Sequence, residues 1–182
     1  MLGPALSCDL IRSSINYSDC EVGRDRRLKK YGIAVCPMTE FCFEGAASWK
    51  GETECDLSIR GKSFVTVSPP PEFGGKQGYC VPEEVFAASL ASCMNTIFLL
   101  IAGNSGMALS KLETKASVKM TAEGLEKLVF THIHFAITVK LTNDSERERR
   151  KAQSIYEKAK RICPLQQSWG DRVPIDFELA IQ

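Results

Sequence analysis

The chain has 182 residues, of which 44% are hydrophobic and 25% are charged, and its 23 basic and 22 acidic residues leave a formal net charge of +1. This length and composition favour one domain, with room for an extension, and allow a sizeable core. The near-neutral charge argues against nucleic acid as the main partner. The first residues lack the basic segment and long apolar run of a secretory signal, so we expect a cytoplasmic protein.

The eight cysteines contain no Cys-x-x-Cys pair, which argues against zinc-binding and thioredoxin-type motifs. In a reducing cytoplasm, eight free thiols would be tolerable. They are Cys8, Cys20, Cys36, Cys42, Cys55, Cys80, Cys93 and Cys163.

Residues 1–37 show no clear period, and we interpret them as an N-terminal extension before a domain that covers residues 38–182. A basic cluster runs from Arg24 to Lys30. Because Asp25 and Glu21 dilute its charge, we interpret it as a solvated face rather than an anion or membrane contact. A cleaved organellar presequence is the alternative.

From Thr39 onward, three short strand-like segments are separated by Gly51 and Gly61, a pattern that predicts an antiparallel meander. The following stretch, Ser68 to Cys80, holds three prolines and three glycines. It predicts a long irregular loop. Loops of this length are commonly functional.

The stretch from Val81 to Ala102 predicts a central helix, which begins at Pro82 because proline is tolerated in a first turn. Glu83 and Glu84 place negative charge at the positive end of its dipole. The helix is apolar on nearly every face and holds neither lysine nor arginine, so we expect it to be buried all round. Its length of about 17 apolar residues, with polar ones among them, favours a core helix over a membrane span.

Two alternating stretches, residues 112–120 and 129–141, predict a hairpin that turns near Gly124. His132 and His134 share the polar face of the second strand. Two histidines at this spacing could share a metal, but no third ligand lies nearby in the sequence, so we interpret them as structural.

Ser145 and Glu148 have the spacing of a capping box, which predicts a helix that runs on to Pro164. Its apolar stripe places Cys163 on the inward face. The alternating residues 173–181 then predict an edge or sheet-ending strand.

Three motifs, PEEVFAASLASC, EFGG and KRICPL, occur in this order of elements and resemble the OsmC/Ohr family of osmotically inducible and organic hydroperoxide resistance proteins. The resemblance covers about Thr39 to Ile181. It implies an OsmC-like α+β fold, with antiparallel sheets around a long buried central helix. It also implies an intertwined homodimer whose central helices pack back to back and whose two active sites lie at the interface.

The resemblance further implies a thiol-dependent peroxidase that reduces organic hydroperoxides, needs no metal or organic cofactor, and is recycled by an external dithiol. Cys93 matches the peroxide-attacking cysteine and Cys163 the resolving cysteine. Glu83 matches the acid that helps hold an arginine over the thiolate. In this chemistry the thiolate becomes a sulfenic acid, which a second thiol condenses to a disulfide.

A buried thiol needs a nearby cation to ionise at neutral pH. The early strands offer Lys50, Arg60 and Lys62, and we choose Arg60 because its planar fork can contact both the thiolate and a carboxylate. Glu83 lies about 15 Å from Cys93 along a straight helix, so a shared site needs a kink or a partner chain. A simple helix-start carboxylate would look the same in the sequence.

Other readings of the same residues stay open. One is an OsmC-like protein that binds a ligand or senses oxidants without peroxidase turnover, and another is a structural dimer in which Cys93 and Cys163 only pack. Cys80 is an alternative resolving thiol, although a loop cysteine without a role is favoured. For the peroxidase, the apolar surroundings of Cys93 favour alkyl or lipid hydroperoxides over hydrogen peroxide.

Overall fold

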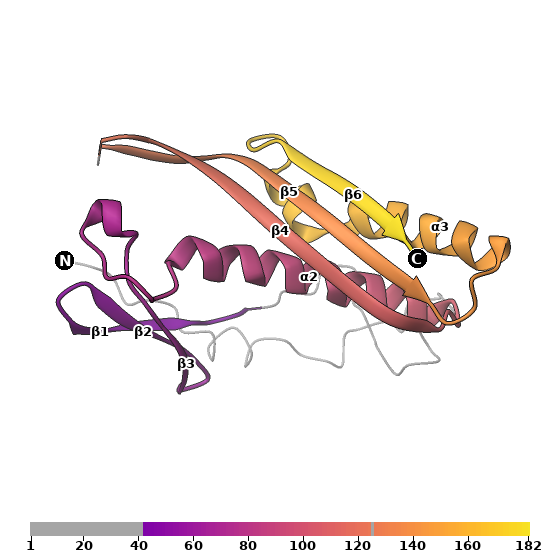
Figure 1. Ribbon diagram of the computed structural model, residues 1–182, viewed down its shortest axis with the longest axis horizontal. Helices are drawn as coiled ribbons and strands as arrows, with labels where there is room; N and C mark the ends of the chain where they lie inside the picture. The colour runs from indigo at the N-terminus through magenta and orange to yellow at the C-terminus, as the bar shows by residue number, and fades with distance from the viewer. Residues whose placement is uncertain (1–41, 125) are drawn as a thin grey trace, which may run out of the picture. The chain divides into compact units, whose positions relative to one another are not determined.

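The computed structural model describes residues 42–124 and 126–182, and it divides into two compact units, one ending at Val67 and the other beginning at Ser68 (Figure 1). The extension predicted for residues 1–37, with its basic cluster, lies outside the described residues.

The first unit contains a three-stranded antiparallel sheet of β1 (Ala46–Gly51), β2 (Glu54–Ile59) and β3 (Lys62–Val67), in that order. This confirms the predicted meander. Arg60 and Gly61, with φ angles of 52° and 74°, form the two-residue turn between β2 and β3. Turns with two positive φ angles match the twist of the strands that they join. The turn places Arg60 at the tip of a hairpin.

The second unit opens with the predicted loop, in which a short 3-10 helix, η3 (Pro71–Phe73), is a regular element that we did not expect. Gly74 ends η3 with a φ of 82°, in the left-handed region that favours glycine. A Cβ atom at Gly75 would lie 1.6 Å from the carbonyl oxygen of Pro69. Both glycines of the EFGG motif are therefore required by the backbone.

The second sheet contains β4 (Leu109–Glu123), β5 (Lys127–Leu141) and β6 (Ile175–Ile181), in that order. β4 and β5 form the predicted antiparallel hairpin, with Gly124 in its turn. β6 pairs parallel to β5, so the expectation of purely antiparallel sheets is wrong for this pair. The reason is the connection, because helices carry the chain from the end of β5 back to its starting end.

Three α-helices belong to this unit: α2 (Pro82–Asn104), α3 (Glu146–Ile162) and α4 (Pro164–Trp169). α2 begins at Pro82, as predicted. The hydroxyl of Ser145 accepts a hydrogen bond of 3.3 Å from the backbone N–H of Glu148, which confirms the predicted cap of α3. α4 was not predicted. Cys163 has an extended backbone, as residues before proline often do, so α3 ends and a new helix starts.

The core of this unit lies between one face of the second sheet and the helices α2 and α3 (Figure 1). Alternate residues of β5, from Ile133 to Leu141, are buried in it. The predicted stripe of α3 is confirmed, since all four of its residues are buried. They are Ala152, Ile155, Tyr156 and Ala159.

α2 buries one stripe of side chains, at every fourth position from Leu90 to Ala102. Leu99 and Leu100 are 51% and 62% exposed. The expectation that this helix is buried all round is therefore wrong for the single chain, because the sheet and α3 cover one side of it. By length and composition α2 could also cross a membrane, but core helices of soluble proteins meet the same criteria.

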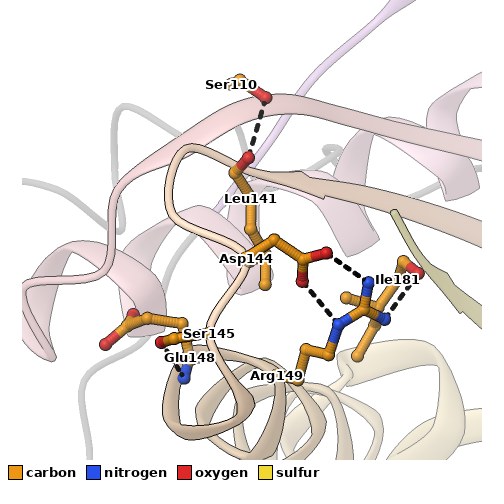
Figure 2. Close-up of polar contacts among 7 residues, drawn as sticks. All are labelled: Ser110, Leu141, Asp144, Ser145, Glu148, Arg149 and Ile181. Carbon is orange, nitrogen blue, oxygen red and sulfur yellow. Dashed lines mark hydrogen bonds and ion pairs between the residues drawn. The ribbon is translucent and has the colours of Figure 1, made fainter.

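Arg149, in the first turn of α3, joins that helix to the end of β6. Figure 2 shows its guanidinium bound to the carboxylate of Asp144, with one N–H donating 2.6 Å to the Oδ2 atom. A second N–H donates to the carbonyl oxygen of Ile181 at 3.1 Å. The hydrogen bond from Arg149 lowers the pKa of Asp144. These contacts fasten the last strand to the start of α3.

Candidate active site

Two cysteines that are far apart in the sequence meet in the second unit. Cys93 lies in the middle of α2 and is partly exposed, whereas Cys163 lies between α3 and α4 and is fully buried. The burial confirms the prediction that Cys163 faces inward. Burial first, and then the charge of Cys163, raise the pKa of Cys93. Because an electrostatic effect falls with distance, the effect of Cys163 on Cys93 indicates that the two thiols lie in the same part of the second unit.

Aromatic rings connect the first half of α2 with β5 and with the end of α4. Phe86 lies seven residues before Cys93, and at 3.6 residues per turn the two share one face of α2 to within about 20°. Trp169, at the end of α4, contacts Phe86 with ring centroids 5.5 Å apart. Phe86 also stacks on Phe130 of β5 at 5.3 Å. We call Phe86, Phe130 and Trp169 the aromatic cluster.

Two buried polar oxygens in the second unit lack a hydrogen-bond partner among the described residues: Oε2 of Glu83 and Oε1 of Gln166. Glu83 lies in the first turn of α2, and this helix runs unbroken to Asn104. Its Cα atom is therefore about 15 Å along the helix axis from that of Cys93. Burying an acceptor without a donor is unfavourable, so both oxygens suit a donor from outside the described residues.

The cations expected near the thiolate all belong to the first unit. Lys50 forms an ion pair with Asp56 at 3.2 Å. Arg60 and Lys62 form no ion pair with the residues that the structure describes. Among those residues, no cation lowers the pKa of Cys93. The role of Arg60 over the thiolate therefore stays a prediction.

The remaining described cysteines lie away from the thiol pair in the sequence. Cys80 is an exposed free thiol just before α2, and Cys55 is a partly buried free thiol in β2. Cys42 is disulfide-bonded, so not all eight cysteines are free thiols.

His132 and His134 each face a carboxylate on the outer face of the second sheet. Nε2 of His132 lies 3.0 Å from Oδ2 of Asp176, and Nε2 of His134 lies 3.7 Å from Oε2 of Glu178. Within residues 42–124 and 126–182, no group of three His, Cys, Asp or Glu side chains could hold a metal ion. Each histidine thus has a structural partner on the neighbouring strand.

An open groove of about 760 Å³ follows another face of α2, where the helix meets β4. Thr114 of β4 donates a hydrogen bond of 2.6 Å to Oδ1 of Asn95 in this groove. Neither Cys93 nor Cys163 lines it, so the groove is separate from the thiol pair. Its lining is mostly small or polar: Glu84, Ala87, Ala88, Ala91, Ser92, Asn95, Thr96, Leu99, Thr114, Lys115 and Ala116.

Residues 74–178 match the family model of OsmC-like proteins. The chain belongs to the OsmC-like family. The match confirms the predicted resemblance, and the two sheets and few helices form the α+β fold of this family. The matched segment contains Glu83, Cys93 and Cys163. No curated protein sequence matches the chain.

Solved structures share the OsmC-like fold over most of the chain. An OsmC-like protein from Mycoplasma pneumoniae is 14% identical, with a TM-score of 0.64 over 79% of this chain and 99% of that one. An organic hydroperoxide resistance protein from Elizabethkingia anophelis is 18% identical, with a TM-score of 0.59 over 79% and 97%. The organic hydroperoxide resistance protein OhrB of Bacillus subtilis is 20% identical, with a TM-score of 0.53 over 78% and 98%.

The sequence patterns did not single out Gln166 or the aromatic cluster. Their common cause is α4, which the patterns missed. Pro164 was interpreted as the end of a helix, although proline is also common in a first turn. Recognising a second helix after Cys163 would have placed Gln166 and Trp169 three and six residues from the thiol pair.

Proposed function

We propose that this OsmC-like protein is a thiol-dependent peroxidase that reduces organic hydroperoxides through a Cys93–Cys163 redox pair. The observation that carries the proposal is a partly exposed thiol beside a fully buried one. In this proposal, the hydroperoxide reaches Cys93 from solvent and Cys163 then reacts with the oxidised Cys93. Fold relatives that are named organic hydroperoxide resistance proteins support the choice of substrate.

The reaction then has three steps. The thiolate of Cys93 attacks the terminal oxygen of the hydroperoxide, the O–O bond breaks, and the alkoxide leaves and takes a proton to become an alcohol. The thiol of Cys163 attacks the sulfenic acid, which forms a disulfide and releases water. An external dithiol reduces this disulfide and is itself oxidised to a disulfide. The cysteine pair thus passes two electrons from the dithiol to the hydroperoxide.

The proposal needs a cation, because burial and Cys163 raise the pKa of Cys93. We propose that an arginine, with Arg60 as the candidate, approaches both Cys93 and the buried oxygen of Glu83. A guanidinium has enough donors to bind a carboxylate and stabilise a thiolate together. Glu83 is too far along α2 from Cys93 for a small cation to serve both, which also favours arginine over lysine.

We further propose that the protein acts as a homodimer in the cytoplasm. Exposed Leu99 and Leu100, next to a groove of small side chains, give α2 an uncovered apolar face. Small residues along a helix allow another helix to approach closely. A second copy of α2 packed on this face would bury the leucines.

The deciding experiment is peptide mapping by mass spectrometry, after reduced protein receives one equivalent of an organic hydroperoxide. A disulfide between Cys93 and Cys163 is expected within the mixing time. Cys93→Ser should form no such link and should leave Cys163 reduced. If wild-type Cys93 stays reduced, or is overoxidised while Cys163 is untouched, the two-cysteine peroxidase is excluded.

A second candidate function is the binding of a small ligand, or the sensing of oxidants, without turnover. The raised pKa of Cys93 favours it, because a thiol that stays protonated at neutral pH is a slow nucleophile. Steady consumption of hydroperoxide in the presence of dithiothreitol would exclude this candidate. A stable oxidised form that dithiothreitol does not turn over would support it.

A further inference from the structure

A row of basic side chains follows the outer face of α3. At 100° per residue its five members fall within an arc of about 100° around the helix axis. The four buried residues of α3 occupy a separate arc of similar width, centred about 140° away. Four members of the row are exposed and one is partly buried. We call these residues the basic stripe: Arg147, Arg150, Lys151, Lys158 and Arg161.

The basic stripe concentrates positive charge on one helix. α3 holds seven basic and three acidic residues, a net charge of +4, whereas the whole chain has a net charge of +1. The other residues of the chain therefore carry a net charge of −3. Segregated charge of this kind attracts a partner of the opposite sign.

Three members of the basic stripe, Arg147, Lys158 and Arg161, form no ion pair with the residues that the structure describes. Arg147 lies in the first turn of α3, at the positive end of the helix dipole. A cation is unfavourable there, so the stability of the helix does not explain this residue. The three side chains therefore suit an anionic partner from outside the described residues.

The basic stripe ends close to Cys163. Arg161 is two residues before this cysteine, and Lys158 is five residues before it, about 7.5 Å along the helix axis. Ile162, between Arg161 and Cys163, is 41% exposed and offers an apolar contact. A partner on this end of α3 thus lies within about two helical turns of Cys163.

We propose that the basic stripe is the docking surface for the reductant of the Cys93–Cys163 disulfide, and that this reductant is an acidic protein with two thiols. Complementary charge speeds the encounter and sets the orientation of the partner. The net charge of −3 outside α3 disfavours an extended anionic surface such as a membrane, because it also meets residues beyond the stripe. This inference rests on the proposed function, but docking can be measured without turnover.

The reduction takes two exchange steps. A thiolate of the partner attacks Sγ of Cys93, the partly exposed cysteine, the S–S bond breaks, and Cys163 leaves as a thiolate and takes a proton. The second thiol of the partner then loses its proton and attacks the partner's own sulfur in the mixed disulfide. Cys93 leaves as a thiolate, and the partner is oxidised to a disulfide.

The kinetic test uses two synthetic peptides with the same Cys-x-x-Cys dithiol, one with a tail of glutamates and one with a tail of serines. At about 0.01 M salt, where charges act over about 30 Å, the glutamate peptide should reduce the oxidised protein at least about tenfold faster than the serine peptide. In the α3 variant, Arg147→Glu/Lys158→Glu/Arg161→Glu, this preference should disappear, whereas dithiothreitol should reduce both proteins at equal rates. A wild type without the preference would overturn the proposal.

The matched control places the same change of charge on the second sheet. The sheet variant, Lys111→Glu/Lys119→Glu/Lys140→Glu, replaces three exposed lysines of β4 and β5. It should keep the preference for the glutamate peptide to within about twofold. Equal losses in the two variants would show that the peptide responds to net charge alone, which would overturn the basic stripe as the docking surface.

A binding test separates this inference from the proposed function. A labelled glutamate peptide, with serines in place of both cysteines, is titrated with reduced protein and followed by fluorescence anisotropy. We expect the dissociation constant to rise at least about tenfold in the α3 variant and less than about twofold in the sheet variant. Selective binding in a protein that forms no disulfide would support the docking surface and refute the peroxidase. If the disulfide forms but both variants bind as the wild type does, the docking surface fails and the peroxidase stands.

Vesicles of phosphatidylserine test the other occupant of the basic stripe. The wild type should not sediment with them at about 0.15 M salt, where exposed charges are screened beyond about 8 Å. Sedimentation that the α3 variant abolishes, without binding of the glutamate peptide, would assign the stripe to a membrane and overturn the proposal.

Discussion

Burial first, and then the charge of Cys163, raise the pKa of Cys93, although Cys163 follows the end of α3 and Cys93 lies in the middle of α2. In the proposed peroxidase, the partly exposed thiol of Cys93 meets the oxidant, and the buried thiol of Cys163 resolves the sulfenic acid.

Replacing Cys163 should divert the oxidation of Cys93 from a disulfide to further oxidation. In Cys163→Ser, the sulfenic acid has no neighbouring thiol and can be oxidised again by excess hydroperoxide. We expect mass spectrometry to find two or three oxygen atoms on Cys93 of the variant, and turnover with a dithiol to fall at least about a hundredfold. Cys80→Ser is the control, and it should keep both the disulfide and the turnover. A disulfide mapped between Cys93 and Cys80 in Cys163→Ser would identify Cys80 as the resolver.

Replacing Arg60 should raise the pKa of Cys93. Burial favours the neutral thiol of Cys93 over its thiolate. Without a cation, the pKa of Cys93 is therefore above the ordinary thiol value of about 8.5. We expect the rate of iodoacetamide labelling at Cys93 to have its midpoint above this value in Arg60→Ala, and at least about one pH unit lower in the wild type. Lys62→Ala should match the wild type. Identical high midpoints for all three proteins would exclude Arg60 as the activating cation.

In Arg60→Ala, which lacks the proposed cation, the pKa of Cys93 raised by burial has a consequence for stability. Between the unfolded and folded pKa values of Cys93, the unfolded chain loses its proton while the folded chain keeps it. Folding stability should therefore fall as the pH rises through this window. The slope should be smaller in Arg60→Ala/Cys93→Ser than in Arg60→Ala, as measured by urea unfolding under reducing conditions at several pH values. Equal slopes in both proteins would show that the thiol does not keep a raised pKa in solution.

Gly75→Ala should destabilise the loop before α2. The new Cβ atom would overlap the carbonyl oxygen of Pro69, and a backbone atom cannot move aside without opening the loop. Overlap of this kind costs about 1–3 kcal/mol of the free energy of unfolding. Gly103→Ala, in the last turn of α2 with open space around it, should instead be neutral or raise that free energy by about 0.5–1 kcal/mol. Urea unfolding of both variants measures the two changes in the free energy of unfolding.

Leu99→Glu should weaken the proposed homodimer. A charge in the middle of an apolar helix contact typically costs more than 2 kcal/mol, so the dissociation constant should rise about 30-fold or more. Sedimentation equilibrium over a range of concentrations measures the change. Ser154→Glu adds the same charge to the exposed side of α3 and should leave the dimer intact. A wild type that sediments as a monomer would refute the dimer itself.

The sequence predicted the elements whose signals are local. The alternating patterns of β4 and β5, the proline at the start of α2 and the cap at Ser145 each depend on neighbouring residues, and the structure confirms them. The side of α2 that stays uncovered could not be predicted, because a helix that is apolar all round does not reveal which face its own chain covers. The direction of β6 was also hidden, since strand pairing depends on the path of the intervening helices.

In the candidate site, too, local sequence patterns predicted some features, and other features depend on the three-dimensional fold. The stripe of α3 located Cys163 in the interior, and its role beside Cys93 came from a resemblance rather than from the pattern. The aromatic cluster joins residues of α2, β5 and α4, so it cannot be predicted from the sequence pattern of any single segment. Gln166 is recognisable only in three dimensions, because its distinguishing property is a missing partner.

The parallel pairing of β6 also sets an order of events during synthesis. Phe177 of β6 stacks on Phe135 of β5 at 5.0 Å, but it follows α3 and α4 in the chain. One edge of β5 therefore stays unpaired until residues up to Ile181 have left the ribosome. Such an edge can pair with a strand of another nascent chain, so sheet closure is the step most exposed to aggregation. Cys93 and Cys163 both precede β6 in the chain, so a disulfide of the proposed redox pair could form before the sheet is complete.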